Sequence, residues 1–289
     1  VMFSFELYKN NQYWIPPIIA EELETFDKTK NPALQTAEAH FYLAYKDNKI
    51  VGKIAAIINW EEVNLLGKRK ARFGWFDAID DIEVTKALLN KVEELGRKHK
   101  MDHMEGPMGF SNLDKVGILS EGFDQMGNMI TWYSLPYYIT HFEQLGFTKE
   151  KEYIESDFSF NNINPEPFQK ASALIKKRYE LRSLNFTKTK DIMPYVDKMF
   201  DLFNETYAKL QSFVPINDIQ KEYFKKKYIG FINPEFIKFI VDKNDNMIAF
   251  AIVMPGFAQA LKKANGKLFP FGFYHLLQAR KHSKEVVFY

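Results

Sequence analysis

Apolar and turn-forming positions follow the same order at two places in the chain. In the first, the apolar runs 41–45 and 50–58 flank residues 46–49, which read Lys-Asp-Asn-Lys. In the second, the runs 237–241 and 247–254 flank the Asp/Asn-rich residues 242–246. Short apolar runs joined by Asp and Asn predict β-hairpins. Helical, aromatic-rich segments precede both hairpins, which indicates an internal duplication, although hairpins also recur in unrelated α/β proteins.

Helices and further strands follow from the same patterns. Val84, Leu88, Val92 and Leu95 lie on one face of a predicted helix with Asp80 or Asp81 as its N-cap. A glycine at 146 predicts the end of a helix over 136–145. Other helices are expected at 18–26, 32–40, 168–179, 193–210 and 218–228. Other strands are expected at 70–78, near 103–105, and at 147–154, 155–160, 179–186 and 285–289.

This order of elements predicts a mixed α/β (α+β) fold of two units in tandem. The length of 289 residues agrees with two domains of ordinary size. The first unit is expected at 1–160 and the second at 168–289, with the Asn- and Pro-rich residues 161–167 as the linker. The chain starts with Val1 and stops at Tyr289 inside an apolar run. Both ends are therefore interpreted as cut, and the second unit as truncated.

Composition and charge exclude several classes of function. The 39 basic and 37 acidic residues leave a net charge of +2, which argues against nucleic acid as a partner. The absence of cysteine excludes disulfides, thiolate metal sites and a cysteine nucleophile, and no metal is expected. No apolar stretch reaches the roughly 18 residues of a membrane span, and the N-terminus lacks a signal-peptide pattern. We therefore expect a cytoplasmic protein without an integral membrane segment; its oligomeric state is not predicted.

Several short segments resemble the GNAT acyltransferase superfamily. The sequence His-Phe-Glu-Gln-Leu-Gly-Phe at 141–147 is similar to the end of the last GNAT helix, and the order of elements in the first unit resembles that fold. Trp-Ile-Pro-Pro at 14–17, Gly-Pro-Met at 106–108 and Leu-Phe-Pro-Phe-Gly at 268–272 resemble a bacterial group of tandem GNAT-like proteins. Some members of that group are linked to N-acylation of sphingoid bases in bacterial ceramide synthesis.

The resemblance implies an N-acyltransferase that uses acyl-CoA or acetyl-CoA as co-substrate. The acceptor would be a small or lipid-like amine, with a long-chain or sphingoid base as the specific expectation. The amine would attack the thioester directly, while a strand N–H holds the oxyanion. The alternative is a non-catalytic GNAT-like binding or scaffold protein.

The first unit departs from the GNAT pattern at two places. Residues 78–84, where the phosphate-binding loop should lie, contain three carboxylates and no glycine, which favours a capped helix instead. Phe142 occupies the position of the usual general-acid tyrosine. Tyr137 and Tyr138, one turn upstream, either replace that tyrosine or pack as aromatics. The first unit is therefore interpreted as degenerate, and the main CoA-binding motif is expected beyond Tyr289.

The catalytic residues are unknown at this stage, but substrate-binding candidates can be named. The glycine-rich loop 106–127 suggests a polar ligand site or merely an irregular loop. Residues 254–275 form an aromatic-rich insertion that either lines a lipid pocket or packs on the sheet. Glu205 is a possible base, although an exposed helical carboxylate is usually only solvated. The candidates for substrate binding are Asn112, Glu121, Tyr138, Asn204, Tyr207, Phe213 and Tyr274.

Overall fold

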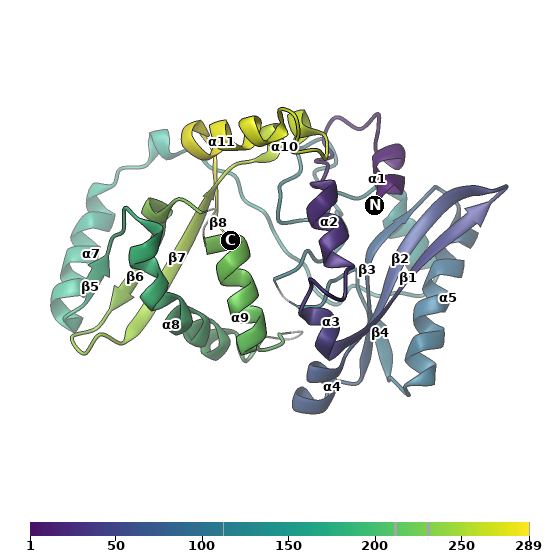
Figure 1. Cartoon of the computed structure of the whole chain (residues 1–289), viewed down its shortest axis with the longest axis horizontal. Coiled ribbons are helices and arrows are strands. Elements are labelled where there is room, and N and C mark those ends of the chain that lie inside the picture. Colours follow the sequence, from purple (N-terminus) through teal and green to yellow (C-terminus); the bar gives the residue numbers. More distant parts are fainter. Residues whose placement is uncertain (112, 211–212, 230–231, 289) are drawn as a thin grey trace.

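The chain folds into two four-stranded sheets with helices packed on them (Figure 1). The computed structural model describes residues 1–111, 113–210, 213–229 and 232–288. All four strands of the first sheet come from the first half of the chain, and all four strands of the second come from the second half. The fold is therefore mixed α/β, as the order of elements predicts.

The first sheet has the order β1-β2-β3-β4. Its strands are β1 (Ala37–Lys46), β2 (Lys49–Asn59), β3 (Lys70–Ala78) and β4 (His103–Glu105). Asp47 and Asn48 both have positive φ angles, 49° and 60°, as a two-residue hairpin turn requires. The three long strands are antiparallel, and β3 pairs with β4 in parallel. The connection between them is α5 (Ile82–Lys98), whose apolar face, including Leu88 and Val92, packs into the core.

The second sheet has the order β5-β6-β7-β8 and is antiparallel throughout. Its strands are β5 (Arg182–Leu184), β6 (Ile237–Val241), β7 (Met247–Pro255) and β8 (Val286–Phe288). Helix α8 (Thr189–Tyr207) buries Ile192 and Val196 against this sheet. Helices α7 (Glu166–Tyr179) and α9 (Asp218–Phe224) complete this half, with a π-helical turn, Lys225–Ile229, after α9.

Most predicted elements are confirmed, and four expectations are wrong, two of them strands within residues 147–160. Residues 147–160 form no strand, because this charged and exposed segment pairs with no sheet edge in the described chain. The helix expected at 32–40 is only the single turn α3 (Ala33–Thr36), since pairing with β2 makes residues 37–40 part of β1. The strand expected at 179–186 shortens to β5, because α7 continues to Tyr179.

The prediction also missed two helices of the first half. These are α1 (Met2–Leu7) and α4 (Trp60–Leu66). The Asn59 side chain caps α4 by accepting hydrogen bonds from the Glu61 and Glu62 amides. The expected helices at 18–26 and 136–145 are α2 (Ile19–Thr25) and α6 (Tyr137–Gln144).

Residues 256–284, called here the crossing segment, connect the second half back to the first. The segment contains α10 (Ala258–Ala264) and α11 (Gly272–His282), which lie across the top of both halves in Figure 1. The Ile19 amide donates a hydrogen bond to the Gly266 carbonyl at 2.9 Å, and Lys262 Nζ donates to the carbonyl of Gln12. Gly266 has a φ of +78°, and a Cβ at this position would lie 2.5 Å from the Phe5 ring. The contact therefore requires glycine.

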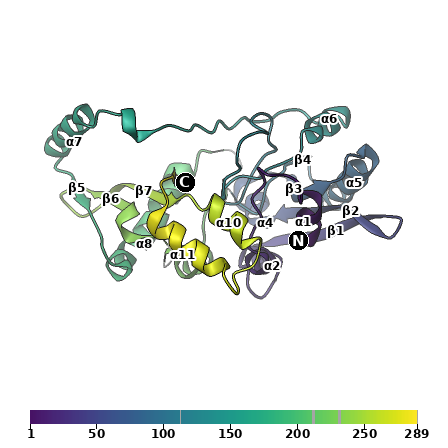
Figure 2. The same ribbon diagram turned by 90° about the horizontal axis from the view of Figure 1, so that it is seen from above.

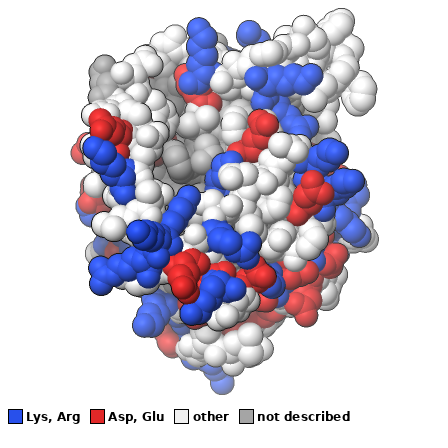
Figure 3. Space-filling view, turned by 90° about the vertical axis from the view of Figure 1, so that its left-hand side faces the viewer, with Lys and Arg blue, Asp and Glu red and all other residues white. Residues whose placement is uncertain are grey.

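Two further observations concern the charge on the surface and the apolar character of the helices. On the face shown in Figure 3, Lys and Arg side chains are interspersed with Asp and Glu side chains. Over the described residues, none of the helices combines the length and the apolar character needed to cross a lipid bilayer.

Candidate functional site

A cavity of about 720 Å³ lies between the two sheets and is lined by both halves of the chain. This volume is in the range of pockets that bind small organic ligands. The first half contributes residues of α1, α2, β3 and the loop 107–134. The second half contributes mainly apolar side chains, among them Phe200, Phe203, Ile252, Phe257 and Leu276. The cavity can therefore hold a ligand with a long apolar part.

The polar part of the wall centres on Asp77 near the end of β3. Its Oδ2 atom accepts a hydrogen bond from Ser4 Oγ at 2.7 Å and lies 3.2 Å from Lys53 Nζ. Its Oδ1 atom accepts hydrogen bonds from the hydroxyls of Tyr8, at 2.9 Å, and Tyr138, at 3.4 Å. All five residues line the cavity, although they come from α1 and its C-cap Tyr8, β2, β3 and α6. Asp77 is thus a nearly buried carboxylate surrounded by proton donors.

Burial controls the ionisation of the two tyrosines. The pKa of Tyr8 is raised well above its usual value by burial and by the nearby negative charge of Asp77. The pKa of Tyr138 is raised for the same two reasons. Tyr138 is also fixed by the Ala78 amide, which donates to its hydroxyl at 3.0 Å. Both phenols therefore keep their protons at neutral pH and act as hydrogen-bond donors toward the carboxylate.

An irregularity in β3 lies at the cavity wall. Lys53 pairs with Asp77 and Ala55 with Gly74, so β3 has one more residue than β2 between these pairs. This is a β-bulge, and Trp75 within it has a φ of +47°. Trp75 and Phe76 lie between these two pairs, within the bulge, and both line the cavity. Non-glycine residues with positive φ in a strand are uncommon and concentrate at functional sites.

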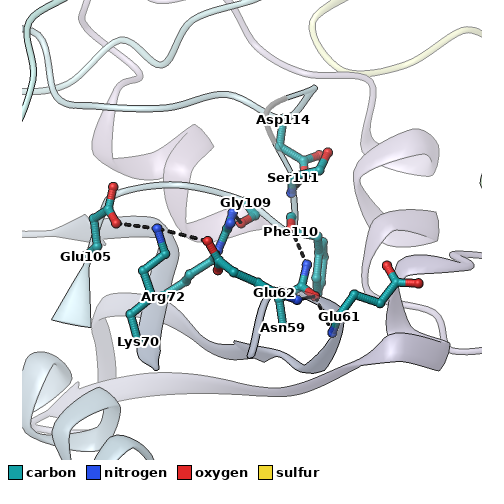
Figure 4. A network of polar contacts seen from close by, with 10 residues as sticks. All are labelled: Asn59, Glu61, Glu62, Lys70, Arg72, Glu105, Gly109, Phe110, Ser111 and Asp114. Atoms are coloured by element: carbon teal, nitrogen blue, oxygen red, sulfur yellow. Dashed lines mark hydrogen bonds and ion pairs between the residues drawn. The ribbon is translucent and has the colours of Figure 1, made fainter. Parts of the chain in front are cut away.

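A buried ion network supports the loop that forms another part of the wall (Figure 4). Glu62 of α4 pairs with Arg72 at 2.8 Å and with Lys70 at 3.0 Å, and Lys70 also pairs with Glu105. Arg72 donates a hydrogen bond to the Gly109 carbonyl at 3.2 Å.

The neighbouring polar contacts continue along this loop. Asn59 donates to the Phe110 carbonyl at 2.8 Å, and Asp114 accepts from the Ser111 amide at 3.0 Å. These contacts hold Phe110, Ser111 and Asp114 at the cavity. Burial raises the pKa of Asp114 and lowers the pKa of the adjacent Lys115, which also lines the cavity.

The structure brings only part of the predicted substrate-binding set to the cavity. Tyr138 and Tyr207 line it. Asn204 instead holds the chain after α8 through two hydrogen bonds with Ile216, and Phe213 is buried against Phe203 and Tyr207. Their roles in binding stay predictions.

The other candidates lie elsewhere. Glu121 and Tyr274 are exposed and are not among the residues that line the cavity. Asn112 lies outside the described residues. Glu205 is exposed on α8, as expected for a solvated carboxylate. Sequence reasoning missed Ser4, Tyr8, Lys53 and Asp77. The available signal for the last was a single acid in the otherwise apolar end of a strand, Gly-Trp-Phe-Asp-Ala.

The start of α5 is built as a capped helix. The Asp81 side chain accepts a hydrogen bond from the Glu83 amide at 3.0 Å and pairs with Lys46 at 2.9 Å. Asp80 lies 3.2 Å from His141. Phe142 is buried against Phe73 and Phe76. These residues therefore have structural partners that do not depend on a bound phosphate.

Comparison with known proteins gives two distant relatives. The chain is 27% identical over 284 residues to Protein YghO of Escherichia coli (strain K12), an alignment that covers 98% of this chain and 72% of that protein. It is 24% identical over 267 residues to the bacterial ceramide synthase of Caulobacter vibrioides (strain NA1000 / CB15N), an alignment that covers 91% of this chain and 68% of that protein. The chain is a distant homologue of a bacterial ceramide synthase. No protein-family model and no solved structure matches it.

Proposed function

We propose that the protein is an N-acyltransferase that joins the acyl group of an acyl thioester, acyl-CoA, to a lipid-like amine bound in the cavity between the sheets. The observation that carries the proposal is a largely apolar cavity with Asp77 and its proton donors on one wall. Four carboxylates and three lysines line this cavity, which suits a cationic headgroup with an apolar chain. The distant relation to a bacterial ceramide synthase supports the same class of acceptor, a sphingoid base.

The halves 1–160 and 168–289 are proposed to be GNAT-like units. Support comes from the order of the first sheet, in which three antiparallel strands are followed by a helix and a parallel strand. The N-terminus of α5 does not fit a pyrophosphate, because Asp81 caps it and neighbouring carboxylates repel phosphate. Coenzyme A is therefore not assigned to that place, and the first half serves as the acceptor-side wall.

The proposed reaction uses groups of the Asp77 cluster. The neutral amine attacks the thioester carbonyl carbon, so that a C–N bond forms and the C–S bond breaks. The nitrogen loses one proton and the departing sulfur gains one. Asp77 is the proposed acceptor of the nitrogen's proton, either directly or through Tyr8. The amides of Trp75 and Phe76 in the β-bulge are the proposed donors to the oxyanion.

The test is an assay with a sphingoid base and acyl-CoA donors of several chain lengths. Amide is detected by mass spectrometry, and released CoA by a thiol reagent. We expect Asp77→Asn to lower kcat/KM by about 10²–10⁴-fold, the contribution typical of a general base. Asp102→Asn is the matched control, because Asp102 is exposed and lies outside the cavity.

Two results would contradict the proposal. One is equal activity of Asp77→Asn and Asp102→Asn. The other is cavity binding of the amine with no thiol release from any donor, which favours the non-catalytic alternative. Thermal unfolding of each variant separates a catalytic loss from misfolding, since Lys53 loses its charged partner in Asp77→Asn.

A further inference from the structure

The outer face of the crossing segment combines exposed aromatic side chains with positive charge. Phe269 and Phe271, between α10 and α11, are 78% and 71% exposed. On α11, Phe273, Tyr274 and Leu277 are also exposed and follow helical spacing along one side. Figure 2, which looks down on this side of the molecule, shows α10 and α11 without other elements in front of them.

The charge of this segment has a single sign. Between Asp245 and Glu285 the sequence contains no aspartate or glutamate, but it contains five lysines and one arginine. Lys263, Lys267, Lys281 and Lys284 are exposed, and none of them forms an ion pair with a carboxylate of the described chain. Elsewhere, exposed cations are commonly paired, as Lys170 is with Glu166 on α7 at 2.7 Å.

The opposite side of the same segment faces the cavity. Phe257 and Leu261, at the start and middle of α10, and Leu276 of α11 line it. Leu276 is thus adjacent in sequence to Leu277, which is exposed on the outer face. One thin layer of chain therefore separates the cavity from the exposed aromatic surface.

We propose that the crossing segment docks on the surface of a lipid bilayer that contains anionic lipids. Aromatic side chains enter the interface between headgroups and acyl chains, and lysines on the same side are attracted to the anionic headgroups. The absence of acids from the segment gives the charge complementarity that this partner requires. The docking places the cavity wall against the bilayer. Entry of a membrane lipid into the cavity is a further step, and that step alone rests on the proposed function.

The rival surface is α7, which also carries exposed apolar residues and basic side chains. Phe168 and Leu174 are exposed on it. However, none of its residues lines the cavity, and Lys170, one of its basic residues, is already paired with Glu166. The aromatic residues Phe158 and Phe160 beside it are exposed to 57% each and supply a control of the same chemistry.

The experiment is sedimentation of the protein with vesicles of phosphatidylcholine alone or with phosphatidylglycerol added. No acyl donor or amine is present. We expect binding to the anionic vesicles and weaker binding to neutral ones. Phe269→Ser/Phe271→Ser should weaken binding at least about tenfold. Lys281→Gln/Lys284→Gln should weaken it about fivefold for each lysine removed, with the effect diminishing at high salt.

Matched controls decide between surfaces. Phe158→Ser/Phe160→Ser and Lys176→Gln/Lys177→Gln should bind as the unmodified protein does. Loss of binding in these controls alone, or no vesicle binding at all, would overturn the proposal. Self-association that depends on Phe269 and Phe271 in analytical ultracentrifugation would assign the face to a second copy and overturn it as well.

The two proposals fail separately. If vesicles are not bound but acyl transfer to a dissolved amine proceeds, the docking is wrong and the proposed function stands. If vesicles are bound through Phe269 and Phe271 but no amide forms, the docking stands and the proposed reaction is wrong.

Discussion

Replacing Glu62 by glutamine tests the reasoning about the buried ion network most directly. Glu62 and Arg72 are each 1% exposed and Lys70 is 3% exposed. Glu62→Gln preserves the shape of the side chain but removes the negative charge between two cations. Lys70 keeps Glu105 as a partner, whereas Arg72 loses the carboxylate that lies 2.8 Å from it. The variant therefore leaves a buried positive charge without that compensation.

The expected cost is large compared with the stability of a typical domain. Breaking a buried ion pair by removing one partner costs about 3–5 kcal/mol, whereas whole domains are stable by about 5–15 kcal/mol. Arg72→Met should cost less, because Glu62 keeps Lys70 at 3.0 Å. In the double variant both charges are gone, so its cost should be below the sum of the single costs by about 1–3 kcal/mol.

The chain contains a natural probe for this measurement. All four tryptophans, at 14, 60, 75 and 132, lie in the first half. Urea unfolding followed by tryptophan fluorescence therefore reports the half that contains the network. A cost below about 1 kcal/mol for Glu62→Gln, additivity of the two substitutions, or a larger cost for Arg72→Met would refute the reasoning.

Three further substitutions have defined outcomes. Gly74→Ala should lower the unfolding free energy by more than about 2 kcal/mol in the same fluorescence experiment, because its Cβ would lie 2.2 Å from the Met108 carbonyl oxygen; an unchanged midpoint would contradict this. The hydrogen bond from His40 lowers the pKa of Glu38 to about 2, so the carboxylate stabilises the fold above pH 4.5 and this contribution disappears as the pH falls toward 2. Glu38→Gln should thus lower the free energy of unfolding by up to about 1 kcal/mol at pH 7 and leave it unchanged near pH 2. An equal loss at both pH values would contradict this reasoning. Asn217→Ala removes a capping box and should lower the free energy of unfolding by about 1 kcal/mol, measured by circular dichroism; no change would show that the cap is dispensable.

Local chemistry explains which parts of the fold could be predicted. The turn at Asp47 and Asn48 and the cap at Asp81 depend on neighbouring residues, so the sequence pattern specifies both. Strands are also predicted at 147–154 and 155–160, but strand formation depends on a partner elsewhere in the chain. In the described chain neither sheet offers an edge that pairs with this segment, and the sequence alone does not reveal this.

The site was less accessible to prediction because it is assembled from distant residues. Ser4 and Asp77 are 73 positions apart, and Tyr138 reaches the same carboxylate from α6. A serine, a tyrosine and an aspartate with such spacing form no recognisable motif. Tyr138 and Tyr207 could be named because the GNAT resemblance places Tyr138 one turn before the usual general-acid position and Tyr207 on a helix that lines the acceptor groove. Asp77 was missed because a lone acid in a strand has no pattern of its own.

The contacts of the crossing segment with α1 and α2 have a consequence for biosynthesis. Lys262 and Gln12, which meet there, are separated by 250 positions. At about 5–20 residues per second, the ribosome needs roughly 10–50 s to make the chain between them. During that time the first sheet can form, but the part of the cavity wall that the first half contributes remains uncovered by the second half. The nascent protein thus has to avoid aggregation through this surface until residues 256–284 emerge.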